Sequence, residues 1–172
     1  MQYTNRTYFV EEYNAAWAQQ FEAERALLAT LLGNGLDIQH IGSTSVPGLA
    51  GKPTLDILVV VEAIAMVEGF KNALESAGYK DLGEYVKPGA RLFVKESNNI
   101  RLVNVHFFES SDVHVHEMLA VRDYLRNSLE EVRRYSAFKK ELFQKYTHDY
   151  AAYRKEKDVY MKALQARAVE NK

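Results

Sequence analysis

The segment His40-Ile-Gly-Ser-Thr-Ser-Val-Pro-Gly-Leu-Ala-Gly-Lys-Pro-Thr-Leu-Asp56 joins a loop rich in glycine and hydroxyl side chains to the start of an apolar run. Gly42 permits a backbone geometry that other residues rarely adopt, and it lies beside the hydroxyls of Ser43 and Thr44. Together with the Lys52 cation, these groups can converge on an anion such as phosphate. The segment therefore predicts a phosphate-binding loop, and a tight surface loop without a ligand is the alternative.

The run from Leu55 to Val61 is apolar and rich in branched side chains, apart from one acidic residue. Such a run is typical of a strand buried on both faces. Asp56 lies at its start, where an unpaired carboxylate would be costly. A metal ion or a basic partner would relieve that cost, so Asp56 is the candidate metal ligand and catalytic carboxylate. In a purely structural loop the same side chain would cap neighbouring backbone amides.

Hydrophobic periodicity and turn residues define the elements on either side of this segment. The expected order is helix, strand, loop, strand, helix, two strands and then helices, over residues 12–32, 38–41, 42–53, 55–61, 63–77, 91–95, 100–108 and 114–170. Residues 96–99 form a polar turn between the two later strands, and Ser128 and Thr147 are expected to cap new helices. The order predicts an α/β (α+β) fold: a mixed β-sheet with an N-terminal helix and a C-terminal helical segment. We expect one domain over residues 1–172, with its core at about 10–110.

Composition narrows the class of protein further. The 172 residues include 22 Lys and Arg, 23 Asp and Glu and no cysteine. The absence of cysteine excludes disulfides, a thiolate zinc site and a cysteine nucleophile. A formal net charge of -1 gives no electrostatic footprint for nucleic acid. No apolar stretch approaches the roughly 20 residues that cross a bilayer, and the first residues do not resemble a signal peptide. We therefore expect a cytoplasmic protein that does not bind a membrane.

Residues 40–59 resemble the hallmark of the GrpB family, a group of small bacterial proteins. The resemblance continues in order through Arg91-Leu-Phe-Val-Lys95, Val105-His106, Val121-Arg-Asp-Tyr-Leu-Arg126, Tyr135, Lys139 and Tyr153. It covers almost the whole chain from the first helix onward. That family is similar to the nucleotidyltransferase superfamily of DNA polymerase beta type, so the resemblance implies a nucleotidyltransferase-like mixed sheet.

The resemblance also implies a reaction. The Gly42-Ser43 turn would hold a triphosphate, and carboxylates would hold Mg²⁺ or Mn²⁺ to neutralise phosphate charge. Active members of the superfamily usually carry two carboxylates separated by one residue on this strand, and a third on a neighbouring strand. This chain has Asp56 alone, and Asn104 and His106 occupy the later strand. These residues favour at most a single metal at Asp56, with His106 or Glu117 assisting.

Further candidates surround this centre. Ligand-binding candidates are His40, Gly42, Ser43, Thr44, Lys52, Arg91, His106 and Arg122. His40 either contacts a ligand or packs. Arg91 and Arg122 either clamp phosphates or form surface ion pairs with acidic residues such as Glu117, Glu130 or Glu131. The pair Lys139-Lys140 and residues 154–157 are expected on a solvated helix face.

Three functions follow from these observations. The first is a metal-dependent enzyme that moves a nucleotidyl group to an unknown acceptor. The second is an inactive module that binds a nucleotide, coenzyme A or another phosphorylated small molecule through the same loop. Domains that resemble GrpB also occur fused to dephospho-CoA kinases, which implies a link to coenzyme A metabolism. The third is a structural or interaction protein with no ligand at the loop.

Overall fold

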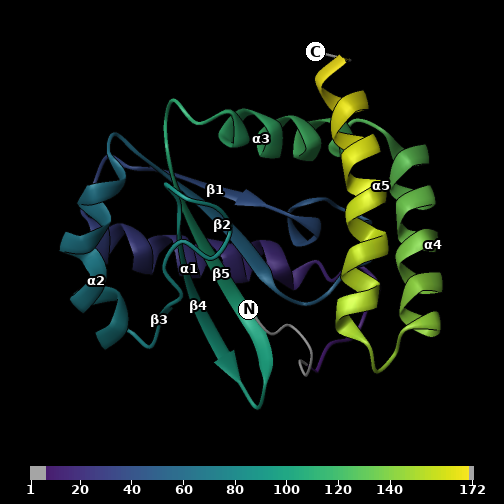
Figure 1. Cartoon of the computed structure of the whole chain (residues 1–172), viewed down its shortest axis with the longest axis horizontal. Helices are drawn as coiled ribbons and strands as arrows, with labels where there is room; N and C mark the ends of the chain where they lie inside the picture. Colours follow the sequence, from purple (N-terminus) through teal and green to yellow (C-terminus); the bar gives the residue numbers. More distant parts are fainter. Residues whose placement is uncertain (1–6, 171–172) are drawn as a thin grey trace.

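A computed structural model describes residues 7–170 (Figure 1). Five strands form one mixed sheet in the order β1-β2-β5-β4-β3, and helices pack on both of its faces. The elements are α1 (Ala16–Leu32), β1 (Asp37–Ile41), the 3₁₀ turn η1 (Ser43–Ser45), β2 (Leu55–Val61), the 3₁₀ turn η2 (Ile64–Met66), α2 (Val67–Ser76), β3 (Lys80–Asp81), β4 (Arg91–Ser97), β5 (Ile100–Glu109), α3 (Val113–Arg126), α4 (Leu129–Lys145) and α5 (Tyr150–Glu170). The predicted fold class, a mixed sheet with an N-terminal helix and C-terminal helices, is confirmed.

The centre of the sheet is a parallel pair of strands. β2 runs parallel to β5, whereas β1 pairs with β2 and β4 pairs with β5 in antiparallel fashion. Five of the seven residues of β2 are buried, as expected of an apolar run covered on both faces. β4 and β5 are joined by a tight hairpin in which Asn98 and Asn99 adopt φ values of 49° and 62°. Asparagine tolerates this left-handed geometry. The predicted polar turn is confirmed at these two residues, whereas Glu96 and Ser97, which were expected in the turn, belong to β4 because they pair with Arg101 and Ile100.

The two faces of the sheet are covered by different helices. One face packs its β2 and β5 side chains, such as Ile57 and Phe107, against α1 and α2. The opposite face packs Leu58 and Phe108 against partly buried side chains of α3. α1 lies behind the sheet in the view of Figure 1, α3 runs across its top, and α4 and α5 stand side by side at the right. Because strand side chains alternate, Asp56 belongs to the α3 face.

Several element boundaries differ from the sequence-based expectation. α1 begins at Ala16 rather than near residue 12, because the Asn14 side chain accepts a hydrogen bond from the Ala16 N–H at 2.9 Å. The start of the expected helix 63–77 is the 3₁₀ turn η2. β3 was not predicted from the sequence, since its two residues are defined by pairing with Phe93 and Val94 rather than by any local pattern.

The predicted caps of the C-terminal helices have opposite outcomes. Ser128 caps α4 as predicted, and its side chain accepts from the Glu131 N–H at 3.3 Å. The prediction for Thr147 was wrong, because its hydroxyl instead donates to the Phe143 carbonyl at 2.9 Å, at the end of α4. Asp149 caps α5 and accepts from the Ala152 N–H at 2.9 Å. A carboxylate two residues further along thus outcompetes the threonine hydroxyl as the cap.

A buried carboxylate ties the last two helices together. The Glu131 side chain on α4 is 4% exposed and accepts hydrogen bonds from Tyr160 Oη at 2.6 Å and Arg167 Nη2 at 3.0 Å, both on α5. Glu131 therefore pairs with α5 and not with the arginines of α3. Within residues 7–170, each helix is too short or too polar to cross a bilayer.

Replacing Glu131 by alanine should destabilise the protein by about 1–3 kcal/mol, because the substitution leaves Tyr160 and Arg167 without their shared acceptor. Glu130→Ala is the matched control, since the Glu130 side chain is 83% exposed and makes a surface ion pair that contributes about 0–1 kcal/mol. Urea unfolding of the two variants measures the difference. Equal free energies of unfolding would contradict the prediction.

Candidate functional site

The chain leaves β1 through a turn that is pressed against the Asp56 carboxylate. Ile41 pairs with Asp56 in the β1–β2 register, so the next residue, Gly42, lies beside that side chain. Gly42 has φ 72°, and a Cβ at this position would lie 2.5 Å from Asp56 Oδ2. Ser45 Oγ donates to the Gly42 carbonyl at 2.6 Å and closes the turn. The turn therefore needs glycine for both its backbone geometry and its contact with the carboxylate.

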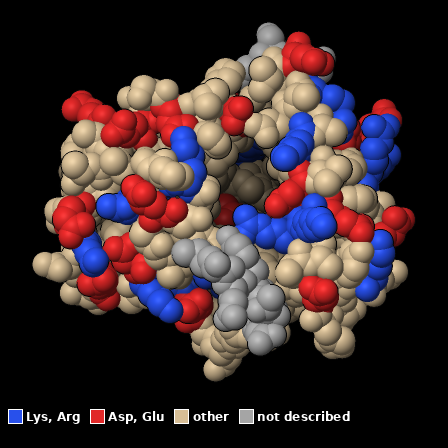
Figure 2. Space-filling model, viewed as in Figure 1, with Lys and Arg blue, Asp and Glu red and all other residues tan. Residues whose placement is uncertain are grey.

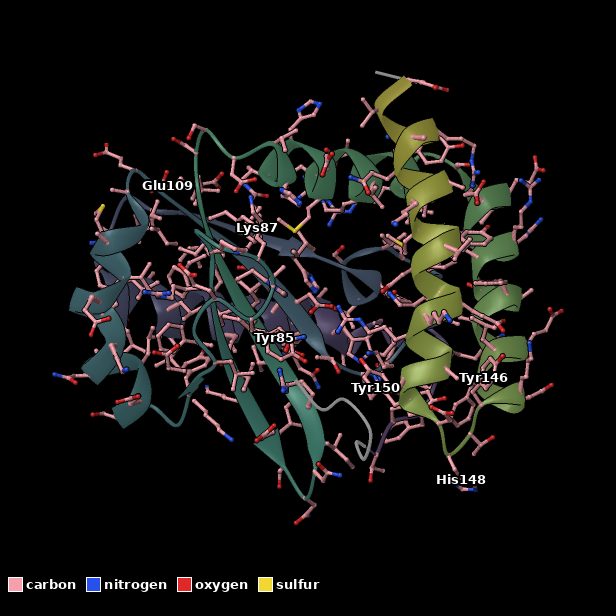
Figure 3. The ribbon with its side chains drawn as sticks, viewed as in Figure 1. Tyr85, Lys87, Glu109, Tyr146, His148 and Tyr150 are labelled. Atoms are coloured by element: carbon pink, nitrogen blue, oxygen red, sulfur yellow. The ribbon has the colours of Figure 1, made fainter. Side chains whose placement is uncertain are left out.

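A cavity of about 420 Å³ opens beside this turn. Its walls come from the Asp56 face of the sheet, from α3, α4 and α5, and from the segment between β3 and β4. Figure 2 shows the hollow in the middle of this face, with basic and acidic side chains at its rim. In Figure 3, Tyr85 lies on the β3–β4 segment and Tyr150 lies at the start of α5, and both residues line the cavity.

Asp56 is held by two residues of the adjacent strand. The parallel register sets Asp56 against Asn104, whose Nδ2 donates to Asp56 Oδ1 at 2.7 Å. His106 Nε2 lies 3.5 Å from the same oxygen. Burial would raise the pKa of Asp56, but the hydrogen bonds and charge of His106, the Asn104 amide and the Lys52 charge together hold it below its ordinary value. The carboxylate is therefore ionised at neutral pH.

These donors do not fit a two-metal centre. Such a centre needs several carboxylates around two adjacent ions. Within the described residues, no group of three or more His, Asp and Glu side chains is placed to hold a metal ion. The side-chain oxygen of Asn104, Oδ1, accepts from Arg101 Nη1 at 2.9 Å, so it is engaged with a cation. Asp56 remains as one ionised oxygen donor, which suits a single cation whose other ligands come from phosphate oxygens.

A buried lysine lies against the turn. Lys139 on α4 is 2% exposed, and its Nζ donates to Ser43 Oγ at 2.8 Å and lies 4.3 Å above the Tyr135 ring. Burial, with the positive charges of Lys157 and Lys52, holds the pKa of Lys139 well below its ordinary value. In the part of the chain that the structure describes, no carboxylate forms an ion pair with it.

The expectation that Lys139 lies on a solvated helix face was wrong. The neighbouring Lys140 is solvated and pairs with Glu12, but Lys139 falls on the stripe of α4 that packs inward. The buried residues of that stripe are Glu131, Val132, Tyr135, Ser136, Lys139 and Leu142. Its spacing of three and four residues was present in the sequence and could have identified Lys139 as a buried position.

Two further lysines face the same space. Lys52 Nζ donates to Tyr150 Oη at 2.6 Å. Lys157 on α5 also lines the cavity, and its Nζ lies 3.8 Å from Asp158 Oδ1. Burial and the charge of Lys52 lower the pKa of Lys157. The sequence predicted that Lys157 lies on a solvated helix face, but in the structure Lys157 lines the same cavity as Lys52. The cavity thus gathers the amino groups of three lysines, Lys52, Lys139 and Lys157, around the Gly42–Ser43 turn.

His40 and Thr44 lie behind the turn and do not line the cavity. His40 Nε2 is 2.9 Å from Thr44 Oγ1, and its ring stacks on Phe21 with 4.4 Å between the ring centres. Burial lowers the pKa of His40 to about 4, so the ring is neutral at neutral pH. The His40 ring thus packs on Phe21 beneath the turn, and its contact with a ligand stays a prediction. The side chains of His40 and Thr44 both support the turn on the side that faces away from the cavity.

The arginine candidates are divided between the two faces of the sheet. Arg122 lines the cavity from α3, and its Nη1 donates to Gln39 Oε1 at 2.8 Å, so it also fastens α3 to β1. Arg91 pairs with Phe107 in the sheet register and so faces α1 and α2, where its Nη1 lies 3.5 Å from Glu84 Oε1. The structure therefore brings Arg122 to the cavity and keeps Arg91 away from it.

Substituting alanine for Gly42 should cost more stability than the same change at Gly78. Both glycines have positive φ, but no atom would lie within 4 Å of a Cβ at Gly78. Gly78→Ala should cost about 1–2 kcal/mol for its backbone geometry. Gly42→Ala should cost about 1–3 kcal/mol more, because its methyl group meets the Asp56 side chain. Urea unfolding compares the two variants, and a smaller loss at Gly42 would contradict the close approach.

Known proteins share both the sequence and the fold of this chain over most of its length. A family model described as GrpB protein matches residues 7–167. A UPF0157 protein of Streptomyces coelicolor is 36% identical over 159 residues, which cover 92% of this chain and 83% of that protein. The crystal structure of the conserved protein GrpB from Enterococcus faecalis matches with a TM-score of 0.89 at 34% identity, over 95% of this chain and 98% of that one.

A more distant likeness concerns the fold alone. The Cid1 poly(U) polymerase matches with a TM-score of 0.51 at 16% identity, over 83% of this chain and 48% of that one. The sheet and the helices described above are therefore arranged as in a nucleotidyltransferase.

Proposed function

The chain belongs to the GrpB family and has a nucleotidyltransferase-like fold, and from that premise we propose that its cavity binds the phosphate groups of a nucleotide or a related phosphorylated ligand. One observation carries the proposal: the buried Lys139 amino group donates to Ser43 and has no carboxylate partner among the described residues. A buried charge is costly unless an opposite charge compensates it. Phosphate bound at the Gly42–Ser43 turn would supply that charge.

The rest of the cavity suits the remainder of such a ligand. Its volume of about 420 Å³ falls within the range of small-molecule sites. The lysines form one part of its lining, and the other part includes the apolar and aromatic side chains of Leu49, Tyr85, Met118, Val121, Tyr153 and Met161. A ligand with a phosphate end and a less polar end, such as a nucleotide or coenzyme A, matches this division.

Calorimetric titration with ATP and with inorganic tripolyphosphate tests the phosphate site. Lys157→Met should weaken both ligands by about tenfold, because one charge-assisted contact is lost. Lys155→Met is the matched control, since Lys155 lies on the same helix but is exposed. It should bind as the unmodified chain does.

The ligand panel should also contain dephospho-CoA, coenzyme A and adenosine. Adenosine has no phosphate and should not bind. Equal affinities in Lys155→Met and Lys157→Met would contradict the assignment of Lys157 to the phosphate site. A lack of response to every phosphorylated ligand would overturn the proposal in favour of a structural or interaction role.

A second function, nucleotidyl transfer with one divalent cation, is favoured by the position of Asp56. Its ionised carboxylate lines the cavity next to the turn, with His106 beside it. Asp56 would hold Mg²⁺ or Mn²⁺, His106 would be the neighbouring donor, and ligand phosphate oxygens would complete the coordination. The cation would neutralise phosphate charge when bound. The missing carboxylates are the reason for placing this function second.

Asp56→Asn tests the cation site without relying on turnover. In the unmodified chain, Mn²⁺ should tighten binding of a non-hydrolysable ATP analogue by about tenfold, equivalent to about 1.4 kcal/mol. In Asp56→Asn the same addition should have little effect, because the anionic oxygen is gone. Calorimetric titrations with and without Mn²⁺ measure both values. Equal tightening in the two proteins would exclude Asp56 as the ligand.

A further inference from the structure

Lys139 is surrounded by cations and neutral groups. Facing its Nζ are the Ser43 hydroxyl from the turn and the backbone of Gly51, where a Cβ would lie 3.5 Å from Nζ. Lys52 contributes a positive charge from the loop and Lys157 contributes another from α5, and the Tyr135 ring lies beneath it on the same helix.

The acidic groups of the cavity are engaged elsewhere. Asp56 receives the Asn104 amide and lies beside His106, and Asp158 lies 3.8 Å from Lys157. Neither carboxylate forms an ion pair with Lys139 in the described chain. The ammonium form of Lys139 is therefore opposed both by burial and by two like charges, and no carboxylate within residues 7–170 pairs with it.

An anion at Ser43 would reverse this balance. It would sit within reach of Lys139 Nζ, because that nitrogen is already 2.8 Å from the hydroxyl that would contact the anion. It would also screen the repulsion from Lys52 and Lys157, so the charged form of Lys139 would become the favoured one.

We propose that Lys139 is uncharged in the ligand-free cavity and takes up one proton when an anion binds at Ser43. The inference rests on the proposed phosphate site and adds to it a coupling between ligand and proton. The cavity then binds anions more tightly as the pH falls, through a group buried beneath the ligand rather than through its surface charge.

The sign of the effect follows from linkage. Burial and the two lysines lower the pKa of Lys139 in the free protein, and a bound anion raises it again. Between the two values, each binding event takes up a proton. Affinity should therefore fall as the pH rises through this window, by at most about tenfold per pH unit. Below the free-state value Lys139 is already charged, and the dependence should vanish.

Sulfate is the appropriate probe, because its own charge stays constant through the titration range of lysine. Calorimetric titration of the full chain with sulfate, in two buffers that differ in ionisation enthalpy, gives the number of protons taken up. The unmodified chain should take up close to one proton per sulfate within the window. Lys139→Met should take up none, and Lys140→Met should behave as the unmodified chain, because the Lys140 side chain is 41% exposed and paired with Glu12.

The outcomes distinguish the coupling between anion binding and proton uptake from the phosphate site itself. Sulfate binding without proton uptake would overturn the coupling and leave the phosphate site standing, whereas no binding of sulfate or of the phosphorylated panel would overturn both. Uptake that persists in Lys139→Met but is lost in Lys157→Met would overturn the assignment to Lys139. If Lys139→Met does not fold, the ¹³Cε resonance of Lys139 in the unmodified chain should still titrate at higher pH with sulfate than without it, and an unchanged midpoint would overturn the proposal.

Discussion

The contact between the Gly42 backbone and the Asp56 side chain constrains everything built around the cavity. β1 and β2 are paired so that the last residue of β1 stands opposite Asp56, and the chain must then turn beside an ionised carboxylate. No side chain fits there, so the position requires glycine, whose backbone adopts φ 72° and carries Ser43 towards the cavity. Two arginines of α3 hold the turn in place. Arg122 Nη1 donates a hydrogen bond to Gln39 Oε1, and Arg126 Nε donates to the Ser45 carbonyl at 3.0 Å.

The second half of the cavity is assembled by packing rather than by strand pairing. Glu131 joins α4 to α5, and Val46 and Leu49 of the loop lie in one apolar cluster with Leu125, Val132, Tyr135 and Leu164 of the three C-terminal helices. Lys139 and Lys157 approach the turn from two neighbouring helices as a consequence. Two of the three lysines that make the loop suitable for an anion therefore come from helices that are remote from it in sequence, and only Lys52 comes from the loop itself.

Local signals were sufficient for most of the fold. The branched run of β2, the asparagine turn of the β4–β5 hairpin and the Ser128 cap each depend on neighbouring residues, and each was predictable. The candidate site was less predictable from the sequence. The face of Arg91 could not be read from β4, because Leu92, Phe93 and Val94 are apolar in succession and are buried on both faces of the sheet. The roles of His40 and Lys139 depend on Phe21 and Ser43, which only the three-dimensional arrangement brings to them.

The bond between Ser43 and Lys139 spans 96 positions of the chain, and it has a consequence for how the protein matures. Contacts so distant in sequence form late, because the entropy of closing a long loop must be overcome first. During synthesis, the turn emerges before α4 and α5 exist, so the Ser43 hydroxyl lacks its Lys139 partner at that stage. The lysine cluster is completed after Lys157 has left the ribosome and α5 has packed. Ligand binding would therefore be among the last properties the nascent chain acquires, and a bound anion would favour the finished arrangement over its partly assembled precursors.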